Sequence, residues 1–433
     1  MSPFNHKLLS NICVIGSGFV LRLGAQVVLF LIITRGLGAS DYGIFVSVTA
    51  LMSVASCFVG WGCDQIFIQH VAPQQERFRD FLGHGLIAIV VTAPVAAAIC
   101  LILLPNIKGT GGVGFPVFVM LALADLFFGR LNSFCAAAYI AIERAVRLSL
   151  LNIGFTSIRL AAAVLAMLIN GHLDIQTWAC WYLVSSTLAG LGSFALVVHD
   201  QGWPRWFIAR GEIASGFQFC IQTVSGAAVR DIDKPILASI VAPEAAGIYA
   251  AAGRFVDTLT IPIRALLYST YSRFIRHGHV AASDSLSFGL RLLPFALGYA
   301  ALAGVALSLG ARFVPLILGA QYAKASEVLP ALAALPFLTA AASIGGDILT
   351  STGQQKARAV IVVVASLSTV VLCPLAIPAF GIFGAVLVSI ASNAILALAN
   401  WSWVFCTVRR AAPDPAPEDN RAIPHDAIKV SVD

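Results

Sequence analysis

The sequence predicts an all-α, polytopic membrane protein, and three observations carry that prediction. Apolar residues make up 59% of the 433 residues and charged residues only 11%, whereas soluble domains average about 25% charged residues. Mean hydropathy is +0.88. Apolar runs of about 20 residues, the length that crosses a bilayer as a helix, recur along the whole chain. This composition excludes an ordinary soluble protein and a disordered one.

Runs bounded by charge, glycine and proline predict about 12 membrane-spanning helices. Helices are favoured because the bilayer core offers no water to backbone groups, and the runs do not alternate in polarity as barrel strands would. The predicted spans cover residues 11–34, 43–63, 81–104, 115–139, 149–169, 176–198, 213–240, 245–271, 285–309, 326–349, 358–379 and 383–406.

The basic residues predict the orientation. Connections on the side of the N-terminus hold pairs such as Arg77 with Arg79 and Arg144 with Arg147, whereas the opposite connections hold only Arg35, Lys108, Arg312 and Lys324. Because Lys and Arg are enriched in cytoplasmic loops, we expect both termini inside. Residues 409–433, with four prolines and mixed charge, predict a disordered cytoplasmic tail.

A short internal repeat divides the chain into two halves. Gly43, Ile44 and Phe45 align with Gly247, Ile248 and Tyr249 at an offset of 204, which is also the offset of six predicted helices. We therefore expect two six-helix bundles, residues 1–205 and 206–408. They would be related by a pseudo-twofold axis along the membrane normal, as in transporters built from parallel repeats.

Motifs for catalysis, metals and nucleotides are missing from the sequence. It has no P-loop and no nucleophile elbow, its nine cysteines form no CxxC pair, and its histidines give no zinc spacing. Asp231-Ile232-Asp233 matches the D-x-D of metal-using glycosyltransferases, but it falls inside a predicted span. We therefore expect no metal, no cofactor, no nucleic acid partner and no enzymatic activity.

Charged residues inside the predicted spans indicate an internal polar cavity, because burial in hydrocarbon is costly. Eight are basic: Arg22, Arg130, Arg159, Arg230, Lys234, Arg254, Arg264 and Arg291. Five are acidic: Asp125, Asp231, Asp233, Asp257 and Asp347. The excess of positive charge predicts an anionic ligand.

Four of these cations are the predicted ligands of that anion: Arg22, Arg230, Lys234 and Arg254. In the hairpin of the seventh and eighth spans, Arg230 and Arg254 lie about 15–21 Å from the turn, near the bilayer midplane. Asp125, Arg130, Arg159, Asp231, Asp233 and Asp257 are interpreted as cavity charges or ion-coupling groups. Alternatively, Asp125 pairs with Arg130 or Arg159, and the acidic residues form salt bridges between the halves.

Several short motifs, in order along residues 8–406, resemble those of bacterial polysaccharide flippases of the O-antigen and exopolysaccharide type. Arg35-Gly36-Leu37-Gly38 with Tyr42-Gly43-Ile44-Phe45 resembles the N-terminal motif, and Asp233-Lys234-Pro235 with Ala246-Gly247-Ile248-Tyr249 the central one. Gly319-Ala320-Gln321-Tyr322 and Thr352-Gly353-Gln354 resemble C-terminal ones, as does the stretch from Ile377 to Ala385.

This family belongs to the multidrug/oligosaccharidyl-lipid/polysaccharide exporter superfamily. The resemblance implies alternating-access transfer of a polyprenyl-pyrophosphate-linked oligosaccharide across the bacterial cytoplasmic membrane, with the four cations holding the pyrophosphate. It also implies membrane lipids, a polysaccharide polymerase and chain-length proteins as partners. One alternative is a multidrug exporter, but its mostly cationic substrates suit an acidic cavity better than this basic one. Another is a lipid II flippase, but members of that subfamily have 14 helices and this sequence predicts about 12. A membrane glycan ligase or polymerase is less favoured, because the predicted outer loops are short.

Overall fold

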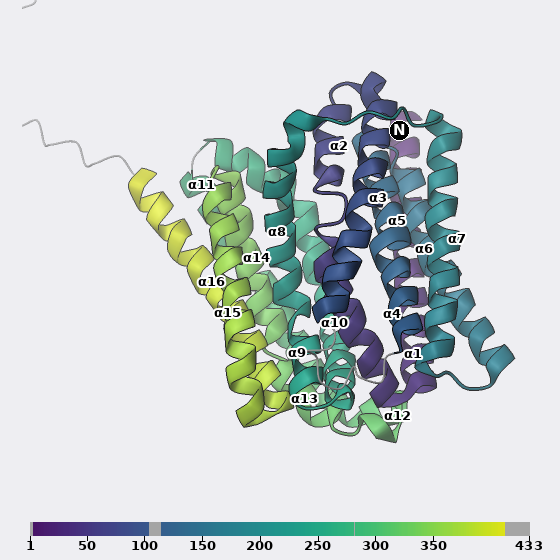
Figure 1. The fold of residues 1–433 in the computed structure, drawn as a ribbon. Coiled ribbons are helices and arrows are strands. Elements are labelled where there is room, and N and C mark those ends of the chain that lie inside the picture. The colour runs from purple at the N-terminus through teal and green to yellow at the C-terminus, as the bar shows by residue number, and fades with distance from the viewer. Residues whose placement is uncertain (1–2, 104–113, 281, 412–433) are drawn as a thin grey trace, which may run out of the picture.

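The computed structural model describes residues 3–103, 114–280 and 282–411, and it is helical over these ranges apart from short connections (Figure 1). The first half contains α1 (Pro3–Ser56), α2 (Cys63–Val71), α3 (Phe78–Leu103), α4 (Phe115–Ala122), a π-helical turn (Leu123–Gly129), α5 (Arg130–Ala141), α6 (Ala145–Asn170) and α7 (Ile175–Gln201). The second half contains α8 (Ile213–Asp231), α9 (Asp233–Ile240), α10 (Pro243–Val280), α11 (Ala282–Gly310), α12 (Val314–Leu318), α13 (Ala325–Leu332), α14 (Leu335–Ser351), α15 (Gln355–Phe380) and α16 (Ile382–Ala411). The predicted tail lies outside the described residues beyond position 411.

Nine segments within the described residues are long and apolar enough to cross a membrane, whereas the sequence predicts about 12. The difference has two physical causes. α1 contains the first two predicted spans, which meet at Gly38 (φ 72°, ψ 176°) and are counted as one. α8–α9 and α10 carry so many polar and charged residues that they do not count as membrane-spanning segments by composition. The chain is nevertheless a multi-pass helical membrane protein.

Several predicted helices are interrupted or longer than expected. The seventh predicted span divides at Ile232, and Pro235 lies in the first turn of α9, where a missing N–H is tolerated. α10, by contrast, runs without interruption through Pro262, although a proline inside a helix weakens it. The tenth predicted span divides into α13 and α14, and α2 is a helix that the sequence analysis did not predict.

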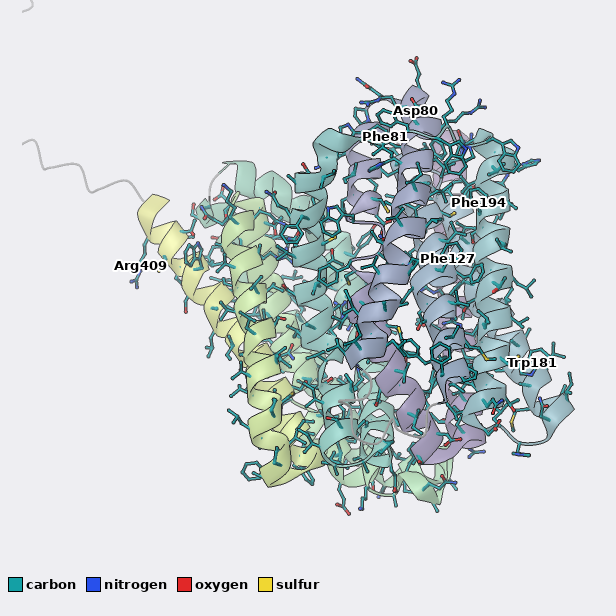
Figure 2. The ribbon with its side chains drawn as sticks, viewed as in Figure 1. Asp80, Phe81, Phe127, Trp181, Phe194 and Arg409 are labelled. Atoms are coloured by element: carbon teal, nitrogen blue, oxygen red, sulfur yellow. The ribbon has the colours of Figure 1, made fainter. Side chains whose placement is uncertain are left out.

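Most of the long helices run between two ends of the molecule (Figure 1), and the connections at these ends differ in their basic residues. We call one the basic end, since its connections carry Arg77, Arg144 and Arg205; Asp80 and Phe81 mark it in Figure 2. We call the other the apex end, after the sharp turn of α1 at Gly38. The short helices α9, α12 and α13 gather near this turn.

The largest hydrophobic cluster joins the two halves toward the apex end, and Phe219 of α8 also packs against it nearer the basic end. One cluster of buried residues contains Ile33 and Tyr42 from α1 together with Ile248, Tyr322 and Ile377 from the second half. A second cluster lies toward the basic end and comes from the second half alone; it includes Ile263, Phe274 and Ile348. Figure 2 shows Phe127 and Phe194 within the first half and Arg409 far from them at the end of α16.

Side chains of the second half satisfy the backbone groups that the turn of α1 leaves free. In a straight helix the Ala39 N–H would donate to Arg35 O; here it donates to Gln321 Oε1 at 3.1 Å. The Tyr322 hydroxyl donates to Thr34 O at 3.1 Å. Arg35 in turn donates to the carbonyl oxygens of Leu316 and Ile317 in the last turn of α12, at 2.8 and 2.7 Å. We call these four hydrogen bonds the apex latch.

The two glycines that the repeat aligns, Gly43 and Gly247, contact each other where α1 meets α10. A Cβ atom built on Gly43 would lie 1.7 Å from Pro243 O and 2.9 Å from Gly247 N. A Cβ built on Gly247 would lie 2.2 Å from Ala39 O. Only glycine therefore permits this backbone contact between the halves.

Candidate functional site: cations between the two halves

The break between α8 and α9 presents a group of charges to the first half. Lys234 Nζ donates to Asp231 Oδ1 at 2.5 Å and to Arg230 O at 2.8 Å. Ser53 of α1 donates its hydroxyl to Asp231 Oδ2 at 3.1 Å. Asp231 is thus neutralised by Lys234 and attached to the first half by Ser53.

Asp233 faces the second half and is occupied there. Its side chain is buried, and Tyr249 of α10 donates its hydroxyl to Asp233 Oδ2 at 2.5 Å. The other carboxylate oxygen, Oδ1, is buried without a hydrogen-bond partner among the described residues. This contact fixes α9 to the start of α10 and sets the relative depth of the two helices.

Arg254 and Arg230 are the accessible cations of this group. Both side chains are exposed, and neither forms an ion pair within the described part of the chain. Arg254 lies beside the hydroxyl of Tyr42 and close enough to Tyr182 of the first half for their charges to interact. Protein atoms surround Arg254 on most sides although solvent reaches it, as expected of a residue that lines a cavity.

Arg22 does not join Arg230 and Arg254. The Phe30 ring of α1 packs edge-on against Phe255 of α10, with ring centroids 6.0 Å apart. Arg22 lies eight residues before Phe30, and therefore about 12 Å farther toward the basic end. Its Nε atom is buried and has no hydrogen-bond partner among the described residues.

Asp125 is hydrogen-bonded to a tyrosine in the first half. It lies in the π-helical turn, a rare geometry that is frequent at functional sites. The Tyr182 hydroxyl donates to Asp125 Oδ1 at 2.7 Å. The Arg159 guanidinium covers the Tyr182 ring at 4.1 Å from its centroid and donates to Ser186 Oγ at 2.9 Å.

Arg130 does not pair with Asp125, one of the alternatives that the sequence left open. It forms an ion pair with Asp64 of α2 at 2.6 Å and donates to Val59 O at 2.8 Å. Asp257 pairs with Arg264 on α10 at 3.3 Å, and both side chains are more than half exposed. Asp231, Asp233 and Asp257 therefore each have a polar partner, whereas Arg230 and Arg254 form no ion pair among the described residues.

Sequence reasoning missed the neutral partners of these charges. Ser53, Tyr42, Tyr182 and Tyr249 were not predicted, and neither was Asp64 as the partner of Arg130. One available signal was tyrosine itself: the chain has eight, and a tyrosine in an apolar helix needs a hydrogen-bond partner for its hydroxyl. Among the described residues no group of His, Cys, Asp or Glu could hold a metal ion.

Comparison with known proteins establishes the family. Residues 8–270 match the family described as polysaccharide biosynthesis protein. The chain belongs to this family. No curated protein matches the chain in sequence. Its fold is similar to transporters of the MOP superfamily, which are generally not enzymes.

Three solved structures illustrate the fold. An inward-facing multidrug resistance MATE transporter has 13% sequence identity and a TM-score of 0.76, and the match covers 90% of the present chain and 95% of the transporter's chain. The lipid II flippase MurJ, in an inward closed conformation, has 12% identity and a TM-score of 0.69, with 91% and 87% covered. A MOP transporter from Pyrococcus furiosus, described as having a binding pocket of reverse polarity, has 14% identity and a TM-score of 0.62, with 92% and 96% covered.

Proposed function

We propose that the protein is a flippase that moves a polyprenyl-pyrophosphate-linked oligosaccharide, an O-antigen or exopolysaccharide repeat unit, across the bacterial cytoplasmic membrane. The observation that carries this proposal is the pair Arg230 and Arg254, exposed between the halves while the nearby acids are occupied. Of the parts of such a substrate, the pyrophosphate is the one that hydrocarbon excludes most strongly. Arginine provides a planar fork of donors suited to phosphate oxygens.

The four predicted anion ligands have different parts in this proposal. Arg230 and Arg254 bind the phosphates. Lys234 is paired with Asp231, so its charge is compensated and two of its three donors are used within the protein. Arg22, about 12 Å nearer the basic end, meets the pyrophosphate on its way to that position. Asp125 stays a candidate for ion coupling, since its carboxylate accepts a hydrogen bond from a neutral hydroxyl and forms no ion pair among the described residues.

The transport cycle proposed is alternating access. The apex latch and the contact between Gly43 and Gly247 close the apex end, where the two halves share one hydrophobic core. Residues 1–205 and 206–408 would move as two lobes, exposing Arg230 and Arg254 first to one side of the membrane and then to the other. The family's polysaccharide polymerase and chain-length proteins are the proposed partners on the far side.

The basic end is proposed to face the cytoplasm, with both termini inside. A reporter active only outside the cytoplasm, fused after Asp174 or Glu244, should be active. The same reporter fused after Arg144 or Lys356 should be inactive. Activity at both of the latter positions would invert the proposed topology.

The alternatives within the superfamily differ in the charge that they would need. A multidrug exporter for cations would be served poorly by unpaired arginines, whereas a lipid II flippase would share the requirement for pyrophosphate. A glycan ligase or polymerase would need catalytic groups in a sizeable outer segment, and the residues between α11 and α13 instead form short helices that contact α1. A lipid II flippase is therefore the main alternative function. The two functions differ in the glycan that is attached to the exported lipid.

The test is export of a lipid-linked glycan in a cell that depends on this protein, combined with binding of undecaprenyl pyrophosphate to the purified protein. Arg230→Ala and Arg254→Ala should each weaken binding about 10-fold to 100-fold, the effect of losing a charged hydrogen bond of about 1.5–3 kcal/mol. Arg312→Ala, which removes an arginine stacked on Phe313 near the apex end, is the matched control and should have no effect. Normal binding and export by the double variant Arg230→Ala, Arg254→Ala would refute the site.

A further inference from the structure

Two helices of the second half that contact α1 of the first half, α8 and α10, carry accessible polar faces toward the basic end. On α8, Gln218 and Gln222 are exposed one turn apart, while Phe217 and Ile221 are exposed on another side of the same helix. On α10 the exposed residues Asp257, Arg264, Tyr268 and Tyr271 fall within about 60° of one another, because each helical residue advances about 100°. We call these two surfaces the polar faces of α8 and α10.

We expect the polar face of α10 to border water and not lipid. The buried side of the same stretch, with Ile263, Leu267 and Phe274, packs into the core of the second half. The exposed surface of α15 differs, because it includes the apolar residues Val360, Val364, Leu367, Val371 and Leu375, as expected of a helix that faces lipid. Polar side chains inside a membrane protein are placed toward aqueous cavities.

The two polar faces lie at the same depth. The hydrogen bond between Asp233 and Tyr249 joins α9 to α10 at one level. Gln218 lies 15 residues before Asp233, and Arg264 lies 15 residues after Tyr249, so both are about 22 Å from that bond toward the basic end. Arg230 and Arg254 lie between this level and the bond. A ligand held there by its phosphates can therefore extend along both polar faces.

The side chains at this level suit a sugar without charge. The glutamine amides and the hydroxyls of the tyrosines offer donors and acceptors for sugar hydroxyl groups. Tyr268 is 89% exposed and Tyr271 41%, so each ring offers an apolar surface for the C–H face of a pyranose. Asp257 and Arg264 neutralise each other at 3.3 Å, which leaves these faces without net charge.

We infer that the polar faces of α8 and α10 form a glycan subsite, in which Gln218, Gln222, Tyr268 and Tyr271 bind the uncharged sugars that follow the pyrophosphate. This inference rests on the proposed function, because it takes the phosphates at Arg230 and Arg254 as the fixed end of the ligand. It adds a substrate class: repeat units whose first sugars are neutral or acetamido sugars, not uronic acids.

The experiment measures the affinity of the full-length protein in lipid nanodiscs for four probes. They are undecaprenyl pyrophosphate alone and the same lipid carrying one glucose, one N-acetylglucosamine or one glucuronic acid. We expect glucose or N-acetylglucosamine to strengthen binding about 10-fold over the bare lipid, equivalent to about 1.4 kcal/mol, and glucuronic acid not to do so. The double variant Tyr268→Ala, Tyr271→Ala should lose this gain and keep its affinity for the bare lipid.

The control variant is Phe295→Ala, which removes an aromatic ring that is 74% exposed among apolar residues of α11. It should keep the gain from the sugar. The glycan subsite is overturned if no neutral sugar strengthens binding, if the gain survives the double tyrosine variant, or if glucuronic acid binds most tightly. Failure of all four lipids to bind would instead overturn the proposed function, and the subsite with it.

Discussion

Replacing Gly43 with alanine should open the apex end. The new Cβ would lie 1.7 Å from Pro243 O and 2.5 Å from Pro243 C, both backbone atoms that cannot rotate away. Contacts of a Cβ atom are essentially never shorter than 3.0 Å, so α1 and the start of α10 must separate by about 1.3 Å. Overpacking of this kind costs about 1–3 kcal/mol, and we expect the upper end because only backbone can move. At 1.4 kcal/mol per tenfold change, states with the apex end open gain up to about 100-fold in population.

The assay is the distance between spin labels on cysteines that replace His172 and Lys324, exposed residues on the apex side of the first and second halves. The exposed native cysteines Cys180 and Cys406 would be replaced by serine. The matched controls are Gly24→Ala on α1 and Gly253→Ala on α10, where an added Cβ meets nothing within 4 Å. An unchanged distance distribution in a folded Gly43→Ala protein would refute the reasoning that this contact holds the apex end closed.

Two further substitutions test other contacts. Arg35→Ala removes two hydrogen bonds of the apex latch. Since the side chain is exposed, the loss should favour the open apex end by about 1 kcal/mol, read from the same distance distribution. Arg35→Lys should recover little, because a single ammonium replaces the two parallel donors of the guanidinium. A larger opening in Arg35→Lys than in Arg35→Ala would contradict this. Arg130→Ala leaves Asp64 without its partner and should lower the free energy of unfolding by about 2–3 kcal/mol, which is less than the loss expected for a fully buried ion pair. The double variant Arg130→Ala, Asp64→Ala should recover part of this loss. Strict additivity of the two losses would show that the ion pair is not what stabilises this region.

The sequence predicted the helical membrane fold because hydrophobic run length is a local property of the chain. It could not predict that the first two spans turn at the single residue Gly38, because such a turn depends on Gln321 and Tyr322 supplying hydrogen bonds from more than 280 residues away. For the same reason α13 and α14 were predicted as one helix. α10 also continues through Pro262: proline weakens a helix, but a helix packed on several sides can continue through it.

The candidate site was predictable in its charges and not in its pairings. Arg230, Lys234, Arg254 and the nearby acids stand out in the sequence because charge is rare inside apolar helices. Which acid neutralises which cation depends on the packing of α1 against α8–α10. The sequence therefore could not distinguish Lys234, which pairs with Asp231, from Arg230 and Arg254, which have no ion pair in the described part of the chain. The sequence could not show how far Arg22 of α1 lies from Arg254 of α10, and the contact of Phe30 with Phe255 puts it about 12 Å away.

In the proposed transport cycle, the shared core at the apex end also favours one resting state. When the apex end opens, Ile33, Tyr42 and Ile248 leave apolar neighbours and meet water that enters between the halves, at a cost of about 25 cal/mol for each Å² of apolar surface. Toward the basic end the second half has a core of its own, and the halves meet there through contacts such as the stacking of Trp61 on Phe217. Because the cluster shared at the apex end is the larger, we expect the empty protein to rest with its binding residues open to the basic side. A substrate, or an ion bound with it, must supply the difference in binding energy that turns them outward.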